Sequence, residues 1–586
     1  MRQWMVAAKK ADFYAIAEKF HVDPVVARII RNREVIGEKN IRIYLGGNLS
    51  DLSDPHQMKD MDRLVEILAQ KIRKQAHIRI IGDYDVDGVT SSHLFLTALR
   101  RVGAKVDVVI PHRIQDGYGL SLHLLQQAKE DGVDTILTCD NGIAAIDEIA
   151  WAKAQKMTVL VTDHHAVPFE EHEGRRTEKK SLADAVVNPH QQDCGYPYKE
   201  LCGAGVAWNV IRVLYENYDM DKREAEDLLD FVAMATVCDV MSLTGENRIL
   251  VKEGLKRIRH TKNIGLQALM QACNVQPENI SAYHFGYVLG PCVNATGRLD
   301  TARHALRLFE TGQETEAEEI ARDLVDLNQE RKELTLQGVE MAKKLCEEGG
   351  YENDPVLVLF LPDVHESIAG LIAGRIREMY NRPVFVLTRG EEGVKGSGRS
   401  TENYSMYENM CGCAELFTKF GGHPMAAGLS LPEENEEKFR RKINENCPLT
   451  VEEVCPDIHI DMAMPVGYAS TELVHQFALL EPFGKDNPSP LFADRNLSIS
   501  RMWVIGKNRN VLRMSVLSEY GQPVPVIFFG DVETLFAYFT EKFGQKEVEN
   551  ALHGRKNRIL FSMVYTAKID FYQGNENLQL EMKYYR

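Results

Sequence analysis

The sequence lacks any run of about 18 apolar residues, and its first five residues, Met1-Arg-Gln-Trp-Met5, lack the apolar core of a secretory signal. We therefore expect no membrane span, no membrane partner and a cytoplasmic location. Internal repeats and low-complexity tracts are also missing. The 586 residues are too many for one hydrophobic core, so we expect about three or four domains.

Cysteine is sparse and unpaired. The 11 cysteines are an odd number, and none of them forms a Cys-x-x-Cys pair. Cys411-Gly-Cys413 is the only close pair, and it has no partners at the spacing of a zinc site. The pattern argues against a disulfide framework and predicts reduced, mainly buried thiols.

Acidic residues outnumber basic residues. The chain has 69 basic and 85 acidic residues, a formal charge of −16, whereas proteins that bind nucleic acids usually present a basic face. A basic groove can still be local, and metal ions can occupy several carboxylates. For most of the candidate groove residues, a solvated surface position is the simpler interpretation; the candidates are Arg375, Arg377, Arg382, Lys395, Arg399, Lys507, Arg509 and Arg513.

Three acids follow the first predicted strand. The mostly apolar run His77 to Ile81 is typical of a buried strand, and Asp83-Tyr-Asp-Val-Asp-Gly88 comes directly after it. Alternation along an extended chain would place the three carboxylates on one side, where they would repel one another unless cations held them. The pattern indicates a site for divalent metal. A capping and turn cluster is the alternative.

Further ligand-type residues follow later apolar segments, with helical patterns between them. The pairs of segment and terminus are Thr135–Cys139 before Asp140-Asn-Gly142, Thr158–Thr162 before Asp163-His-His165, and Leu228–Val237 before Cys238-Asp239-Val240. In open α/β sheets, ligands collect at the carboxyl ends of the strands. A lone Asp in such a place is usually a cap, and a His pair is often a surface turn, but the ordered set favours one metal centre.

These motifs, taken in order, resemble the four motifs of the DHH phosphoesterase superfamily. Further segments are similar to the RecJ family of single-stranded-DNA-specific exonucleases within it, and the resemblance runs from about residue 40 to the C-terminus. Those segments are Gly290-Pro-Cys-Val-Asn-Ala-Thr-Gly-Arg-Leu299, Gly396-Ser-Gly-Arg-Ser400, Gly421-Gly-His-Pro-Met-Ala-Ala-Gly428 and Leu480-Glu-Pro-Phe-Gly-Lys-Asp-Asn-Pro488.

Pattern and resemblance together predict an α/β chain with a two-lobed core. The alternation of strands and helices from Ile78 to about residue 240 predicts a mainly parallel sheet. A long, charged stretch without proline predicts a connecting helix, and a second α/β lobe follows it with its glycine clusters on loops. The resemblance implies a C-terminal OB-fold. The expected divisions are 1–70 (helical segment), 71–313 (DHH catalytic domain), 314–349 (connecting helix), 350–450 (substrate-binding domain) and 451–586 (OB-fold).

Such residues are suited to phosphodiester hydrolysis. They can bind two divalent ions, which activate water and stabilise the leaving oxygen. The resemblance implies that Asp140 bridges the two ions and that Asp85 binds the first ion. Related pyrophosphatases have a histidine at the position of Ile81, and Asp83 would compensate for its absence as a ligand of the first ion. Asp87, His164 and Asp239 would bind the second, Asp163 would orient an imidazole, and His165 would contact the scissile phosphate. Imidazole ligands favour Mn²⁺, with Mg²⁺ as the alternative.

The resemblance also implies residues that hold the end of a nucleic acid. Arg113, Arg298, Ser397 and Arg399 would grip a terminal 5′-phosphate, with Asn294 in the same segment as Arg298. Gly421 and Gly422 would let the backbone approach a phosphate, to which His423 would donate. The two glycines could also stop a helix after Phe420, which is compatible with a phosphate contact. A structural ion pair is the alternative for Arg298, although its Asn294-Ala-Thr-Gly297 context favours a functional role.

The expected function is therefore that of a single-stranded-DNA-specific exonuclease working in the 5′ to 3′ direction, which releases 5′-mononucleotides in DNA recombination and repair. Single-stranded DNA is the expected partner, together with a helicase or a single-strand-binding protein. Two alternatives stay open: a phosphodiesterase of short RNAs or cyclic dinucleotides, and a noncatalytic replication scaffold. No role is assigned to residues 1–34.

Overall fold

The computed structural model describes residues 3–113, 116–117, 119–172, 175–299, 301–390, 393–506, 509–572 and 574–586. Lys507, a candidate groove residue, lies outside them. The chain divides into two units, the first comprising residues 48–456 and the second residues 3–47 together with 457–586. The expected N-terminal segment of residues 1–70 is thus divided between the two units after Gly47. No helix in the described ranges is long and apolar enough to cross a membrane.

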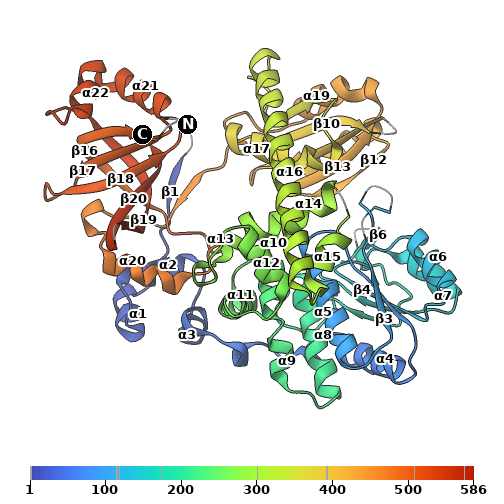
Figure 1. Ribbon diagram of the computed structural model, residues 1–586. Coiled ribbons are helices and arrows are strands. Elements are labelled where there is room, and N and C mark those ends of the chain that lie inside the picture. Colours follow the sequence, from blue (N-terminus) through green and yellow to red (C-terminus); the bar gives the residue numbers. More distant parts are fainter. Residues whose placement is uncertain are drawn as a thin grey trace. The chain divides into compact units, whose positions relative to one another are not determined.

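The first unit begins with a five-stranded, wholly parallel sheet in the order β3-β2-β4-β5-β8 (Figure 1). Side chains of α4, α5 and α8 pack on one face, and those of α6 and α7 pack on the other. Covering on both faces explains why β2 and β4 are buried throughout. The bounds are α4 (Met61–Arg73), β2 (Ile78–Ile81), α5 (Val86–Arg101), β3 (Val106–Val109), α6 (Leu122–Glu130), β4 (Thr135–Cys139), α7 (Ile146–Ala154), β5 (Thr158–Thr162), β8 (Ala185–Val187) and α8 (Gly203–Asn217).

A group of helices follows the sheet, after a hairpin of β6 (Phe169–His172) and β7 (Arg175–Glu178) that precedes β8. The apolar stretch before Asp239 forms α10 (Leu229–Cys238), so this terminus is the end of a helix and not of a strand. Its hydrophobic residues are buried nearly all round, a pattern that a short sequence shares with a buried strand. The other helices are α9 (Lys222–Glu226), α11 (Gly245–Ile258), α12 (Ile264–Ala272), α13 (Ala282–His284), the π-helical turn Phe285–Leu289, α14 (Gly290–Leu299) and α15 (Arg303–Glu310).

The long helix α16 (Glu314–Glu348) leads from these helices to the second lobe, as the charged stretch without proline predicts (Figure 1). Gly338 lies where α16 meets α17 (Glu366–Tyr380). A Cβ on Gly338 would lie 2.3 Å from Ile372 Cδ1, so the glycine allows the two helices to approach closely.

The second lobe contains a five-stranded sheet in the order β12-β13-β11-β10-β9, in which β9 and β10 run parallel and the other neighbours run antiparallel. The expectation that its glycine clusters lie on loops is wrong, because they form strands. Gly396 and Gly398 leave room for buried side chains: a Cβ on either would lie 2.5 Å or less from a neighbouring side chain. The elements are β9 (Leu357–Phe360), β10 (Val384–Gly390), β11 (Gly393–Arg399), α18 (Met406–Cys411), β12 (Lys419–His423), β13 (Ala426–Leu431) and α19 (Glu436–Glu445).

The second unit is built around a closed barrel. Strands β16, β17, β18, β20 and β19 pair in that order, and β16 pairs with β19 to complete the ring, as expected of an OB-fold. The N-terminal strand β1 pairs in parallel with β14. A buried ion pair, with Arg33 Nη1 2.6 Å from Asp461 Oδ1, also joins residues 3–47 to residues 457–586. The bounds are β1 (Trp4–Val6), α1 (Phe13–Phe20), α2 (Pro24–Asn32), α3 (Glu38–Gly46), β14 (Ile458–Ile460), β15 (Met462–Ala463), α20 (Thr471–Phe477), β16 (Phe492–Ile505), β17 (Val511–Leu517), β18 (Pro523–Phe529), α21 (Val532–Phe543), α22 (Gln545–Leu552), β19 (Leu560–Tyr572) and β20 (Asn575–Tyr585).

Candidate active site

The three acids after β2 do not alternate along an extended chain, because α5 begins within them. Asp85 is the N-cap of α5, and its side chain accepts a hydrogen bond from Gly88 N at 3.0 Å. Asp87 lies in the first turn and accepts from the backbone N–H groups of Gly203 at 2.6 Å and Ala204 at 2.7 Å. The start of α8 therefore fixes the Asp87 carboxylate, a support that the sequence pattern did not indicate.

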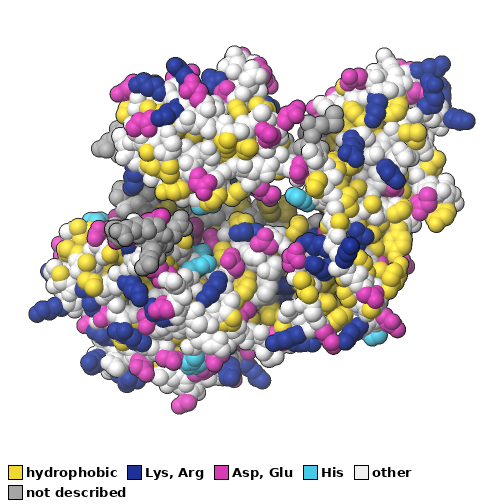
Figure 2. Space-filling view, turned by 180° about the vertical axis from the view of Figure 1, so that it is seen from behind, with side chains coloured by type: hydrophobic (Ala, Val, Ile, Leu, Met, Phe, Trp, Pro, Cys, Tyr) yellow, Lys and Arg dark blue, Asp and Glu magenta, His cyan; other side chains and the backbone are white. Residues whose placement is uncertain are grey.

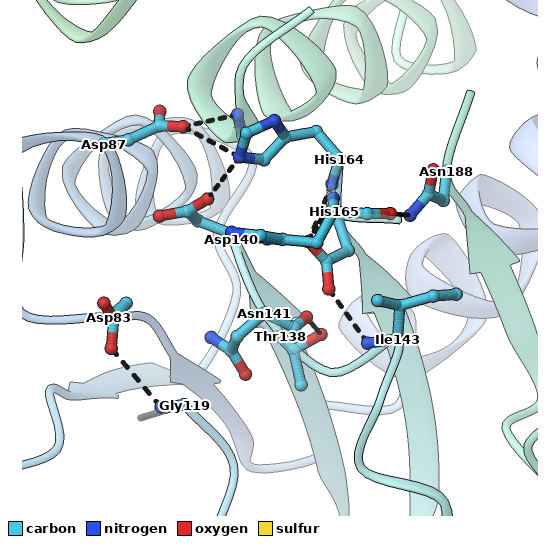
Figure 3. A network of polar contacts seen from close by, with 12 residues as sticks. Asp83, Asp87, Gly119, Thr138, Asp140, Asn141, Ile143, His164, His165 and Asn188 are labelled. Atoms are coloured by element: carbon cyan, nitrogen blue, oxygen red, sulfur yellow. Dashed lines mark hydrogen bonds and ion pairs between the residues drawn. The ribbon is translucent and has the colours of Figure 1, made fainter. Parts of the chain in front are cut away.

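One imidazole brings three carboxylates together. His164 Nε2 lies 3.0 Å from Asp140 Oδ1, 3.6 Å from Asp87 Oδ2 and 3.6 Å from Asp239 Oδ2. Figure 3 shows Asp87 and Asp140 converging on the His164 ring. These four residues come from the ends of β4, β5 and α10 and from the first turn of α5, and they meet at the carboxyl edge of the parallel sheet.

Two sets of ligand atoms are close enough to hold metal ions. The atoms of Asp87, His164 and Asp239 lie within 4.8 Å of one another, and so do those of Asp140, His164 and His165. The first set is the one predicted for the second metal. Asp83 and Asp85 belong to neither set among the described residues, although both lie in the same loop.

Burial makes the acids costly without cations. Burial, together with the charges of Asp87, Asp85 and Asp239, raises the pKa of Asp140 well above its usual value. Burial and the charge of Asp85 raise the pKa of Asp83 in the same way. Asp83 Oδ2 is buried and makes no hydrogen bond with any described residue, and the partners of buried His164 Nε2 are the ion-pair contacts with the three carboxylates. Carboxylate oxygens and an imidazole nitrogen are suitable ligands for Mn²⁺ or Mg²⁺, so the donor set fits divalent metal.

The backbone at Asp140 is strained. Its φ of +61° is in the left-handed region, which non-glycine residues adopt at a cost of about 1–3 kcal/mol. Gly203 packs against the same residue, since a Cβ on Gly203 would lie 2.6 Å from Asp140 Cβ. Gly88 is equally constrained, because its Cβ would lie 2.5 Å from Asp83 N. These contacts fix the position of the carboxylates.

Asp163 orients the second histidine of its motif. Its Oδ1 lies 2.8 Å from His165 Nδ1, and its Oδ2 accepts from Ile143 N at 2.9 Å. Burial alone would lower the pKa of His165, but the hydrogen bond and charge of Asp163 raise it to about 9. Asp163 thus favours the protonated form of the His165 ring, and 43% of the His165 side chain is exposed.

Three arginines gather near the same loop. Burial and the charges of Arg113, Arg331 and Arg399 lower the pKa of Arg298 to about 9. Burial, Arg113 and Arg377 lower the pKa of Arg399. The guanidinium of Arg113 lies 4.9 Å from the centre of the Tyr84 ring. Crowded positive charge of this kind becomes favourable when an anion joins it.

A cavity of about 470 Å³ lies where the two lobes of the first unit meet. Tyr84 and Arg113 contribute from the first lobe, while Ser367, Ser397 and Gly421 contribute from the second. Arg399 Nη1 donates to Ser397 Oγ at 3.3 Å, and Arg298 Nη1 donates to Ser367 O at 2.6 Å. The cavity also has Lys395 and Lys419 in its wall, of which the sequence pattern indicated only Lys395.

Five predicted substrate residues are not in the wall of this cavity: Asn294, Arg298, Arg399, Gly422 and His423. Asn294 Oδ1 accepts from Val86 N at 3.2 Å, so it positions the start of α5. The backbones of β12 and β13 approach closely at Gly422, because a Cβ added to this residue would lie 2.5 Å from Ala426 O. His423 is exposed at the end of β12, and its Nδ1 accepts from Met425 N at 3.3 Å.

Tyr84 and Gly203 were missed in the sequence. Tyr84 lies between Asp83 and Asp85 in the sequence, and its ring contacts the guanidinium of Arg113. Gly203 and Gly205 at the start of the apolar helix α8 were a usable signal, since glycines there allow close approach of another backbone.

Family models match three parts of the chain: the DHH family, N-terminal domain at residues 77–236, the DHHA1 domain at residues 353–447 and the RecJ OB domain at residues 460–584. The single-stranded-DNA-specific exonuclease RecJ of Haemophilus influenzae is 32% identical over 582 residues, covering 96% of each chain. The RecJ of Bacillus subtilis is 32% identical over 87% of this chain, which spans 63% of that relative.

Solved structures agree with these matches. RecJ from Thermus thermophilus in complex with Mn²⁺ superposes with a TM-score of 0.81 and 25% identity, over 100% of this chain and 79% of that one. An exonuclease RecJ bound to manganese gives a TM-score of 0.57 at 32% identity, over 66% of this chain and 94% of that one. The predicted fold class is confirmed.

Proposed function

The chain belongs to the RecJ family of the DHH phosphoesterase superfamily, and from this we propose that it is a metal-dependent exonuclease specific for single-stranded DNA. It removes 5′-mononucleotides in the 5′ to 3′ direction, in the cytoplasm, during DNA recombination and repair. A helicase or a single-strand-binding protein would supply its substrate. The observation that carries the proposal is the convergence of Asp87, Asp140, His164 and Asp239, together with a cavity whose wall includes Arg113, Lys395 and Lys419.

Two divalent ions, with Mn²⁺ preferred over Mg²⁺, fit this donor set. Asp87, His164 and Asp239 would hold one of them, and Asp85 with Asp83 would hold the other, with Asp140 shared between them. When bound, such a pair lowers the pKa of an attacking water and neutralises charge on the phosphate. The chain itself contributes by fixing Asp87 through the amides of Gly203 and Ala204.

His165 would donate to the scissile phosphate. Its ring is held by Asp163 at 2.8 Å, and its raised pKa keeps the donor proton in place at neutral pH. A cationic donor aimed at the phosphate stabilises the negative charge that develops there during attack. Asp163 is therefore a positioning residue that acts through His165.

The arginine cluster would bind the terminal 5′-phosphate. Arg113, Arg298 and Arg399 repel one another until an anion neutralises them, and Ser397 adds a hydroxyl donor beside Arg399. The cavity volume of about 470 Å³ is at the lower end of the range of ligand pockets, roughly 300–1,000 Å³, and suits one nucleotide better than a base pair. Binding the end of one strand here would set both polarity and strand specificity.

The barrel of the second unit would add contacts to the strand. Trp503 and Phe529 are exposed at 38% and 56%, so they are available to stack on bases, whereas Phe528 is buried. On the face seen in Figure 2, basic and acidic side chains are interspersed, which is compatible with the net charge of −16.

Digestion of end-labelled DNA tests the proposal. With Mn²⁺, a long 5′-labelled single strand should lose its label as a mononucleotide at once, while the same strand labelled at its 3′ end shortens progressively. A blunt duplex and the matching RNA should be cut far more slowly. Faster cleavage of a dinucleotide than of a long strand would favour the phosphodiesterase alternative. Release of no nucleotide from any single strand would favour the scaffold.

The phosphate pocket has its own test. Wild-type protein should digest a 5′-phosphorylated strand faster than a 5′-hydroxyl strand, and Arg399→Gln should lose this preference, because the preference depends on the charge of the guanidinium. Arg389→Gln is the matched control: Arg389 lies on neighbouring β10 but pairs at 3.0 Å with exposed Glu433. An Arg399→Gln protein that still prefers the phosphorylated strand by the wild-type ratio would remove the residue from the pocket.

A further inference from the structure

Two cysteine thiols face each other between helices of the first unit. Cys273 Sγ and Cys292 Sγ are 3.7 Å apart. Cys273 is the C-cap of α12, and Cys292 lies in the first turn of α14. The fold brings the two residues together across 19 positions of sequence, a spacing that carries no signal of its own.

The two thiols differ in reactivity. Cys273 is partly exposed, whereas Cys292 is 1% exposed and accepts a hydrogen bond from Asn328 Nδ2 at 3.3 Å. Contact with Cys292 and the charge of Lys332 together lower the pKa of the Cys273 thiol despite its partial burial. A reachable thiol with a lowered pKa is the usual form of an oxidant-sensitive cysteine, and a second thiol beside it can resolve the first product.

We propose that Cys273 and Cys292 form an oxidation site, at which hydrogen peroxide converts the two thiols to a disulfide and thereby slows turnover. The Cys273 thiolate attacks one peroxide oxygen, the O–O bond breaks, and a sulfenic acid and water result after proton transfer. The Cys292 sulfur then attacks the sulfenic sulfur and displaces a second water. The thiols lose two electrons and two protons in all, and peroxide is reduced to water.

The geometry allows this bond at the cost of a small shift. A disulfide requires about 2.05 Å between the sulfurs, so the present 3.7 Å must shorten by side-chain rotation and movement of a helix end. Cys292 and Cys273 lie on separate helices, both of which pack against α16. The start of α14 is therefore drawn toward the end of α12.

Helix α14 connects this shift to the active site. Two residues after Cys292, Asn294 accepts from Val86 N at 3.2 Å and so holds the start of α5, which carries Asp87. Gly297 packs against Tyr84, since its Cβ would lie 2.5 Å from Tyr84 O. Arg298 reaches the second lobe through Ser367 O at 2.6 Å. Displacing one end of α14 disturbs the acidic loop and the arginine cluster together.

Peptide mapping after oxidation tests the site. Wild-type protein, Cys273→Ser and the control Cys411→Ser, which changes an exposed cysteine, are treated with peroxide in the presence of a chelator, alkylated and digested without reductant. A peptide that joins residues 273 and 292 is expected in wild type and in Cys411→Ser. Digestion of single-stranded DNA, assayed after removing peroxide and adding Mn²⁺, should fall about tenfold in those two proteins and return with dithiothreitol, while Cys273→Ser stays active.

Several results would overturn the inference. These are thiols at 273 and 292 that both remain open to alkylation, a sulfinic acid on Cys273 without a cross-link, a cross-link that leaves turnover unchanged, or an equal loss of activity in Cys273→Ser. The cross-link is detected by mass, so its presence or absence is decided independently of the proposed nuclease activity.

Discussion

Asp140 combines a buried carboxylate, four acidic neighbours and a left-handed backbone at φ +61°. Each property alone is destabilising, and bound cations at this carboxylate, as we propose, would offset the cost. Asparagine adopts the left-handed region more readily than alanine does, so Asp140→Asn removes the charge with little change in backbone.

Asp140→Asn should lower the rate of DNA digestion by more than about 100-fold, the upper end of the loss seen when an outer partner of a metal ligand is removed. Its melting temperature in a chelator should equal or exceed that of wild type, because a buried repulsion is relieved. Asp134→Asn, which alters a carboxylate paired with Lys71, is the control. Near-normal digestion by Asp140→Asn would refute its role between the metals.

The buried His93, also on α5, should make the stability of the fold depend on pH. Burial lowers the pKa of His93 to about 3, and its Nδ1 has no hydrogen-bond partner within the described ranges. The ring packs against Phe231 at 4.4 Å between centroids. In the unfolded chain its pKa is about 6.5. Stability is therefore retained above pH 6.5 and lost as the pH falls toward 3, since the unfolded state takes up the proton first.

His93→Phe should remove this loss while keeping the ring contacts. Its advantage in unfolding free energy over wild type should grow by about 1.4 kcal/mol for each pH unit below about 6.5. Urea unfolding of both proteins at pH 8 and pH 5.5, with a chelator present, measures the effect. An advantage that is the same at both pH values would show that His93 is protonated in the folded protein.

At the scale of elements, the N-terminus of α8 holds the acidic site. Gly203 lies against Asp140, where a Cβ would be 2.6 Å from Asp140 Cβ, while a Cβ on Gly205 would meet the side chain of Leu201 no closer than 3.4 Å. Gly203→Ala should therefore displace the Asp140 carboxylate and lower digestion about 100-fold, the cost of a misplacement near 1 Å. Gly205→Ala lies in the same helix and should be within a few-fold of wild type.

Manganese binding by the two glycine variants, measured by dialysis, separates displacement from loss of fold. Gly203→Ala should bind Mn²⁺ more weakly than Gly205→Ala while giving the same far-ultraviolet circular dichroism. Equal affinity and equal activity in the two variants would mean that α8 does not position the site.

Elements with a strong local pattern were predictable. Strands β4 and β5 and the long helix α16 begin or end where their apolar or charged runs do. The stretch before Asp239 was harder to predict, because a fully buried helix such as α10 shows no amphipathic period. The glycine-rich strands β11 and β12 were taken for loops, since glycine is ordinarily depleted in strands and only tertiary packing explains it there.

The site was predictable in its membership more than in its geometry. Carboxylates at the ends of parallel strands must meet, so the grouping of Asp140 with His164 follows from topology. The roles of Gly203, Asn294 and Tyr84 depend on contacts between distant segments, and no local pattern records them. Likewise, the association of residues 3–47 with 457–586 depends on pairing of β1 with β14.

At the scale of the whole molecule, the net charge of −16 means that positive charge for binding a polyanion would have to be concentrated locally, and we propose that the arginine cluster provides it. Tyr84 follows Asp83 in the acidic loop, and its ring contacts Arg113, with which it lines the cavity. The acids would repel DNA without metal, which makes substrate binding as well as turnover depend on divalent ions.

Counting bound manganese tests this account most directly. Equilibrium dialysis of the whole chain at neutral pH should find two Mn²⁺ per wild-type molecule, and Asp140→Asn should bind less than that at the same free concentration. Wild-type protein that binds no Mn²⁺, or Asp140→Asn that binds two with unchanged affinity, would contradict the claim that these acids and His164 form a paired metal site.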